Sequence, residues 1–159
     1  LDATGWTGAW YPAGLVVTAG GNTITNNTFK AFSSAVFLQV CDCSNVADDP
    51  NTFTDNTFID NRTGLHYFVA GPCGSTTVSA TITGNSFDGG TWGGPDAVDM
   101  IGVRWNEVGG PFPNYLDAEC NWWNDAQGPN AAVESSLITA GVNVVPWLTA
   151  PGGDCDGGI

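Results

Sequence analysis

Positive charge is scarce in this chain. Among 159 residues there are 3 Lys and Arg against 16 Asp and Glu, and the net charge is -13. Because neutralising phosphate groups requires Lys and Arg, we expect no nucleic-acid partner. The same sign disfavours contact with an anionic membrane surface, and no apolar run approaches the roughly 20 residues that span a bilayer. Membrane insertion is therefore not expected.

Histidine and strong helix formers are also scarce. The single His excludes a histidine-rich metal site, and Leu, Ala, Lys and Glu are too sparse to predict helices. The chain is nevertheless rich in core material, with 42% hydrophobic residues, seven Trp and eight Phe. Its length is that of one domain. We assign residues 1–150 to this domain and 151–159 to a glycine-rich acidic tail.

The clearest pattern is an internal repeat. Asn27, Asn56 and Asn85 follow one another at equal intervals of 29 residues, and Phe29, Phe58 and Phe87 keep the same register. Asn121 and Trp123 continue the two columns after a longer interval. The repeats fall near residues 22–40, 51–69, 80–103 and 116–148.

The repeat unit predicts two strands plus turns. Alternating residues and an excess of Thr, Ile, Val and Phe favour strands over helices. A short strand pair cannot bury its inner face alone, but copies stacked about 4.8 Å apart share one core and pair in parallel. The pattern therefore predicts a parallel β-solenoid, in which the Phe column stacks inside and the Asn column bonds along a turn. Larger side loops are expected at 41–50, 70–77 and 104–114.

Several motifs in the sequence resemble a known family. They are the repeated Asn-x-Phe, the glycine-led second strands and the closing run Asn121-Trp122-Trp123, Gly128-Pro129 and Pro146-Trp147-Leu148. Over about residues 14–148 these resemble secreted right-handed parallel β-helix modules of the pectate-lyase-like superfamily. The resemblance implies an all-β, right-handed parallel β-helix of about four to five coils with extended side loops. It does not imply one function, because this architecture hosts lyases, hydrolases, adhesins and stalks.

The five cysteines favour an oxidising compartment, so we expect the protein to be extracellular or on the cell surface. The positions of Cys43 and Cys73 in side loops of adjacent coils predict a disulfide, with Cys41 as the rival partner. Cys120 is then expected to pair with Cys155. The remaining cysteine, Cys41, is free or bonded to another chain.

The sequence also contains candidate sites for calcium binding and for N-linked glycosylation. Flexible loops rich in carboxylates suit Ca²⁺, although such residues are also ordinary solvated turn acids. No other cofactor is expected. The candidate calcium ligands are Asp42, Asp48 and Asp49 in one loop or Asp154 and Asp156 in the tail, and the Asn-x-Thr glycosylation candidates are Asn26 and Asn61.

Catalytic groups are few. A polysaccharide lyase of the superfamily would need calcium-binding carboxylates beside a base, but the repeat puts no acidic cluster next to Lys30, Arg62 or Arg104. A hydrolase would need paired carboxylates, and the pattern favours no such pair. His66, between Leu65 and Tyr67, is expected to face outwards from a strand. We therefore predict a protein without enzymatic activity and keep a lyase as the less favoured alternative.

The two ends of the chain suggest self-association. Neither end shows an amphipathic helix or polar cap, and aromatic residues gather there, with Trp6, Trp10 and Tyr11 at the first end and Trp147 at the second. Head-to-tail contact between copies would give a filament or cell-surface assembly. The alternative is a carbohydrate-binding or adhesin module of a larger surface protein. The start at Leu1 fits a processed or excised segment in either case.

Overall fold

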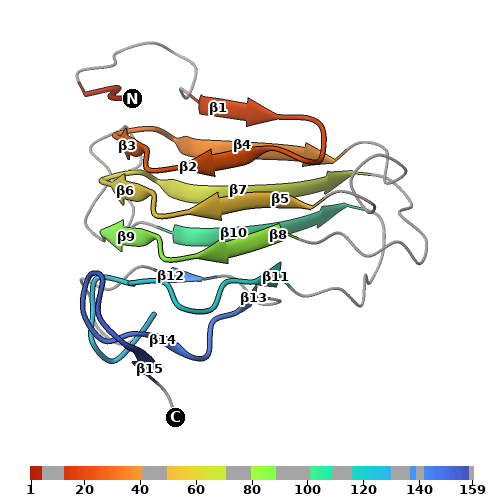
Figure 1. Ribbon diagram of the computed structural model, residues 1–159. Helices are drawn as coiled ribbons and strands as arrows, with labels where there is room; N and C mark the ends of the chain where they lie inside the picture. Colours follow the sequence, from red (N-terminus) through yellow and green to blue (C-terminus); the bar gives the residue numbers. More distant parts are fainter. Residues whose placement is uncertain are drawn as a thin grey trace.

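The computed structural model of the chain describes residues 1–4, 13–40, 50–70, 80–88, 101–108, 116–129, 137–138 and 142–157. Within these ranges the protein is all-β and has no helix. The same ranges hold no helix with the length and apolar character required to cross a membrane. Parallel strands lie in stacked sheets, which is consistent with a parallel β-helix (Figure 1).

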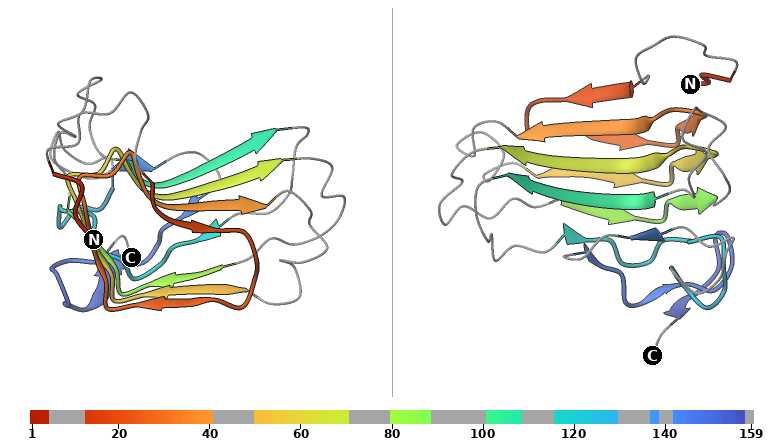
Figure 2. Two further views of the ribbon diagram at one scale, coloured as in Figure 1. Left: turned by 90° about the horizontal axis from the view of Figure 1, so that it is seen from above. Right: turned by 180° about the vertical axis from the view of Figure 1, so that it is seen from behind.

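Each of the first three repeats contributes one strand to each of three sheets. Seen from above, the strands of successive repeats lie over one another (Figure 2). The long sheet has the order β1 (Ala13–Val17), β4 (Ser34–Val40), β7 (Thr63–Ala70), β10 (Ile101–Val108) and β12 (Leu137–Ile138). The first short sheet comprises β2 (Thr23–Thr25), β5 (Asn51–Thr54) and β8 (Ala80–Thr83), and the second comprises β3 (Thr28–Lys30), β6 (Thr57–Ile59) and β9 (Ser86–Asp88).

Two smaller pairs complete the described strands. β11 (Leu116–Asp117) pairs in parallel with β13 (Val142–Asn143). β14 (Trp147–Leu148) pairs with β15 (Cys155–Gly157), and this pair is antiparallel. The direction of the last strand thus differs from that of the stack below which it lies (Figure 1).

Aromatic rings form one continuous column through the core. Phe29 stacks on Phe58 with ring centroids 5.4 Å apart, and Phe58 stacks on Phe87 at 4.8 Å. Trp123 ends the column 4.8 Å from Phe87, with an angle of 11° between the ring planes. All four side chains are buried. The column expected from the repeat is therefore present, and Trp123 is the core member of the tryptophan pair.

Small residues on the long sheet make room for these rings. Gly64 and Gly102 occupy the same register position of β7 and β10, directly facing the aromatic column. A Cβ atom on Gly64 would lie 2.9 Å from the ring of Phe87, and one on Gly102 would lie 2.8 Å from the ring of Trp123. The glycine-led second strands of the sequence are thus the counterpart of its Phe column.

An asparagine ladder joins the repeats at the corner between the two short sheets. The Oδ1 atom of Asn56 accepts hydrogen bonds from the backbone N–H and the Nδ2 amide of Asn27. Asn85 does the same for Asn56, and Asn121 does so for Asn85. The amide of each lower member also donates to the backbone of the repeat above, as Asn56 Nδ2 does to Ile24 O at 2.8 Å. These buried amides fix the stagger between neighbouring repeats.

The residue before each ladder asparagine turns the chain. Asn26, Asp55, Gly84 and Cys120 all have φ between 55° and 69°. This left-handed conformation favours Gly and tolerates Asn and Asp, which explains why three of the four positions carry these types. The same backbone corner therefore recurs in every repeat.

Removing a ladder amide should cost more in the middle of the stack than at its edge. We expect Asn85→Ala to lower the free energy of unfolding by about 2–4 kcal/mol, because it leaves buried partners of the amide unsatisfied. Asn27→Ala is the matched control, since Asn27 is exposed, and should cost about 1 kcal/mol or less. Urea denaturation of both variants measures the difference. Equal losses would show that the ladder does not hold the repeats together.

Tyr67 gives the core a dependence on alkaline pH. Burial raises the pKa of this phenol from 10.0 to about 12, against the opposing effect of a hydrogen bond with Asn51. Because the folded pKa is the higher one, the neutral phenol is stabilising below pH 10, and this contribution is lost as the pH rises towards 12. Between pH 9 and 11.5, wild type should lose about 2 kcal/mol more unfolding free energy than Tyr67→Phe. Parallel losses in urea titrations would contradict this assignment.

Candidate functional site

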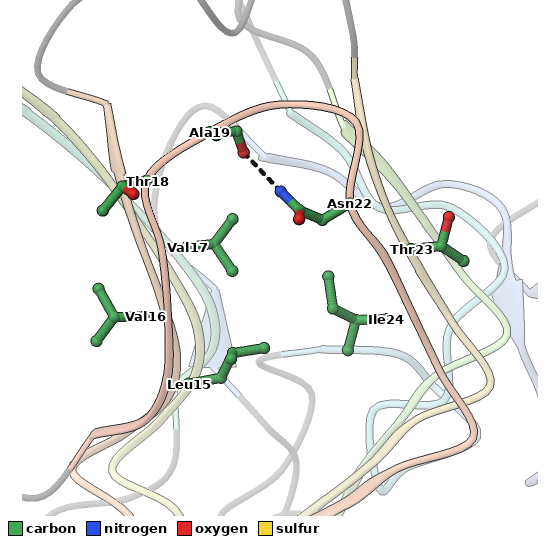
Figure 3. Close-up of a pocket in the computed structure, with 8 residues that line it drawn as sticks. All are labelled: Leu15, Val16, Val17, Thr18, Ala19, Asn22, Thr23 and Ile24. Carbon is green, nitrogen blue, oxygen red and sulfur yellow. Dashed lines mark hydrogen bonds between the residues drawn. The ribbon is translucent and has the colours of Figure 1, made fainter.

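The upper end of the stack contains a hollow. It has a volume of about 330 Å³ and is lined by Leu15, Val16, Val17, Thr18, Ala19, Asn22, Thr23 and Ile24. Figure 3 shows Leu15, Val17 and Ile24 pointing into it, whereas Val16, Thr18 and Thr23 point away. The Nδ2 amide of Asn22 crosses its rim to Ala19 O at 2.8 Å. The hollow is thus apolar inside with an amide at its edge.

This hollow marks a place where the three sheets end unevenly. Beyond β3, residues 1–3 add one more parallel segment, with Asp2 opposite Lys30 and hydrogen bonds of 2.9 Å on each side. Beyond β4, β1 does the same for the long sheet. The first short sheet begins at β2, and no strand of the described ranges lies beyond it. One strand position is therefore open among the described residues.

The backbone of β2 faces this open position. Asn22 O accepts from Thr52 N and Asn26 N donates to Thr54 O, so these residues turn their polar groups towards β5. In a parallel pair, alternate residues bond to opposite sides. The N–H groups of Thr23 and Thr25 and the carbonyl of Thr23 therefore point to the open side. The Thr25 carbonyl accepts a hydrogen bond from Asn27 Nδ2 at 2.8 Å.

One strand edge at the lower end is covered, which corrects the expectation that neither end has a cap. β15 covers the outer edge of β14, and a disulfide joins Cys155 to Cys120 in the last corner, the pairing that the sequence predicts. A Cβ atom on Gly157 would overlap the ring of Trp147, and one on Gly128 would lie 2.6 Å from it. Trp147 is half-buried and packs against these two glycines, and its role as a self-assembly contact stays a prediction.

The outer face of the long sheet carries the histidine. His66 lies opposite Phe37 in the register of β4 and β7. Its ring is 5.0 Å from that of Phe37 and 6.4 Å from that of Phe68, edge to face in both cases. Its Nδ1 atom lies 3.5 Å from Ser34 Oγ. His66 therefore faces outwards as expected, within a half-buried aromatic patch formed with Phe37 and Phe68.

The two glycosylation candidates differ in their exposure to solvent. Asn61 is buried, with its Nδ2 donating to Phe29 O and its Oδ1 accepting from Phe32 N. Its assignment as a glycosylation site is therefore wrong for the folded chain, because the amide is engaged in the core. Asn26 is exposed, and glycosylation there stays a prediction.

Of the two candidate calcium sites, only the one in the tail lies within the described ranges. Asp154 and Asp156 are exposed, and across the described part of the chain no three His, Cys, Asp or Glu side chains gather as a metal site. Calcium at these two residues stays a prediction. The following predicted site residues lie outside the described ranges: Cys41, Cys43 and Cys73, Asp42, Asp48 and Asp49, and Trp6, Trp10 and Tyr11.

The hollow itself was not expected from the sequence, although a signal for it exists. Residues 13–40, which include β1 to β4, contain no Asp or Glu in a chain with 16 of them. A stretch of this length without acidic residues, within an acidic protein, indicates a surface that is less hydrated than the rest. Residues of the hollow belong to this stretch.

Comparison with known proteins identifies the family. The sequence matches the NosD family, described as periplasmic copper-binding protein, over residues 9–128. The match covers 120 of the 159 residues. The chain belongs to the NosD family. This is a family of parallel β-helix proteins, which agrees with the strand arrangement. No curated protein and no solved structure matches the chain.

The described residues do not fit a copper site of the NosD family. Copper prefers imidazole, thiolate and thioether ligands. His66 is the only imidazole of the chain, and its described neighbours are two phenyl rings and a hydroxyl group. Cys120 and Cys155 are joined in a disulfide and offer no thiolate. This part of the chain therefore offers no set of ligands suited to copper.

Copper titration can test the position of His66. Because one imidazole between two phenyl rings is a poor site, we expect His66→Ala to bind Cu(I) and Cu(II) with the same stoichiometry and affinity as wild type. Isothermal titration calorimetry of the two oxidised proteins measures both quantities. Loss of a tight site in His66→Ala, with folding unchanged by circular dichroism, would identify His66 as a copper ligand.

Proposed function

We propose that the chain is a structural module without enzymatic activity. In this proposal it is a right-handed parallel β-helix of four to five coils that works outside the cytoplasm, at the cell surface or beyond it, and the closing run around Trp122 and Trp147 forms its last coil. Membership of a family described as periplasmic supports the compartment. The disulfide between Cys120 and Cys155 supports it as well. The handedness follows the rule for parallel crossover connections.

The observation that carries the proposal is the way the last coil is secured. An antiparallel strand covers the edge of β14, and a disulfide ties that strand to the last corner. Open strand edges promote pairing with other β-structure, and a covering strand prevents it. A stack whose last coil is covered and crosslinked suits a structural module.

The self-associating filament is the less favoured alternative, because segments at both ends stand in its way. If β2 of one copy continued the sheet beyond β13 of the next, β3 would fall on the position of β15. Residues 1–3 would then fall on the position of β14, because they lie one strand beyond β3. Intact copies therefore cannot stack flush head to tail unless both segments move.

The surroundings of the described basic residues give little support to an enzymatic function. Lys30 lies between Asp2 and Ile59 in the strand register, so it has one carboxylate beside it. A lyase would need several carboxylates to hold calcium next to the base. The Ser34 and His66 pair resembles the first two groups of a hydrolytic triad. Its 3.5 Å separation is at the outer limit of a hydrogen bond.

A carbohydrate-binding role is the second candidate, and a specific feature favours it. Phe37 and Phe68 stack with centroids 5.9 Å apart on the outer face of the long sheet, with His66 beside them. Aromatic rings beside a polar group are typical of the lining of ligand sites.

Imaging of the purified oxidised protein tests the structural proposal. We expect particles of single-module length at high concentration and no fibres, because β15 and residues 1–3 prevent flush stacking. Negative-stain microscopy and mass photometry measure particle length and mass. Incubation with polyuronates should yield no absorbance from unsaturated products.

Three outcomes would change this conclusion. Fibres from the oxidised protein would favour the head-to-tail filament. Unsaturated uronate products would identify a lyase. Binding to arrayed glycans by wild type, lost in Phe37→Ala and kept in the distant surface variant Thr149→Ala, would favour the carbohydrate-binding module.

A further inference from the structure

We infer that the outer face of the first short sheet is an ice-binding surface, an activity that goes beyond the proposed structural role. Strands β2, β5 and β8 each present two outward threonines, one on either side of an inward Ile or Phe. The strand register places them in two columns, Thr23, Thr52 and Thr81 in one and Thr25, Thr54 and Thr83 in the other. Three members of this threonine array are exposed and three are half-buried.

The fold does not require this uniform face. In the same three coils the second short sheet varies at its outward positions, which are Thr28, Thr57 and Ser86 in one column and Lys30, Ile59 and Asp88 in the other. Counted back from the ladder asparagine, the fourth coil has Asp117 and Glu119 in place of the two threonines. The preference of Thr for strands acts on both short sheets alike, so it does not explain why only one of them is uniform.

The asparagine ladder holds each row of the array at its centre. Ladder Nδ2 amides donate to the carbonyl between the two threonines of a strand, at 2.8 Å for Asn56 to Ile24, 2.9 Å for Asn85 to Phe53 and 2.8 Å for Asn121 to Ile82. The three strands also lie over one another when seen from above (Figure 2). Because the threonine side chain is stiff at χ1, the hydroxyl and methyl groups are held in a regular pattern.

The spacing of the array is close to that of hydrogen-bonded water in a lattice. Neighbouring strands lie about 4.8 Å apart. With O–H···O distances of about 2.75 Å in tetrahedral geometry, two oxygens bonded to the same water are about 4.5 Å apart. If the middle row is in register with ice, each outer row is displaced by about 0.3 Å, which is within the range of O–H···O distances. Along a strand there are only two threonines, about 6.6 Å apart, so no mismatch accumulates in that direction.

The chemistry of the face also suits ordered water. Each hydroxyl offers one donor and two acceptor sites, and the bond from Thr54 Oγ1 to Thr25 Oγ1 at 3.2 Å uses only part of them. The array has no charged side chain, although the net charge of the protein is -13. Because a charged group organises its own hydration shell, its absence leaves the lattice on this face undisturbed. Liquid water has no fixed repeat, so a rigid array of this spacing selects ice.

Ice recrystallisation tests this surface directly. In a frozen sucrose solution held just below melting, the full oxidised chain should keep ice crystals small at concentrations where serum albumin does not. The chain should also be taken up by a slowly growing ice hemisphere, which excludes ordinary solutes. Thr52→Lys places a charged chain at the centre of the array and should raise the concentration required for inhibition by about tenfold or more.

The second short sheet provides the matched control. Thr57 is an outward, half-buried threonine of the same coil as Thr52, so Thr57→Lys makes the same change on the other face. It should leave ice inhibition at the level of the wild type, whereas a merely structural role of the threonines predicts equal effects. Thr81→Lys changes an exposed member of the array and should act like Thr52→Lys. It keeps the test decisive if Thr52→Lys unfolds, because exposed substitutions cost little stability.

Two results would overturn the inference. One is exclusion of the wild type from growing ice together with crystal growth equal to that in serum albumin. The other is equal loss of inhibition in Thr52→Lys and Thr57→Lys when both are folded by circular dichroism. Either result leaves the proposed function intact if the particles remain short and inactive, whereas fibres or lyase products would overturn that function independently of ice binding.

Discussion

The hydrogen bonds of the asparagine ladder determine the rest of the structure. Each ladder amide holds the backbone of its own corner and that of the neighbouring repeat, so the stagger between repeats is fixed at one point of every coil. A slip of one residue in a strand would turn every inward side chain outwards. With the stagger fixed, the Phe rings meet face to face and the glycines of β7 and β10 meet the rings. The packing of the core is thus a consequence of the polar corner.

Much of this arrangement can be predicted from the sequence, because the repeat is strict where it matters. The equal spacing of Asn27, Asn56 and Asn85 gives both columns and the parallel pairing. Asn61 was assigned wrongly, since the residue above it in the repeat is Phe32. Its ladder role is visible only when the side chain is seen to bond the backbone of that phenylalanine.

The ends were harder to predict, since they depend on contacts that break the repeat. The segment around Cys155 and Gly157 reads as a glycine-rich tail, but its lack of side-chain bulk is what lets β15 lie against Trp147. The hollow depends on which sheet lacks a strand at the upper end, and no local pattern records that. The NosD family is described as periplasmic and copper-binding, yet the described imidazole of this chain lies among phenyl rings rather than other metal ligands.

The Cys120 to Cys155 disulfide gives the stack a direction of unfolding. In a solenoid each coil contacts only its neighbours, so separation can begin at either end and advance coil by coil. The crosslink ties the last strand to the corner of the coil before it, so that strand cannot leave alone. The first coil has no such covalent link among the described residues. Thermal unfolding should therefore advance from the first coil towards the crosslinked one, and the amides least accessible to exchange should lie near Trp123.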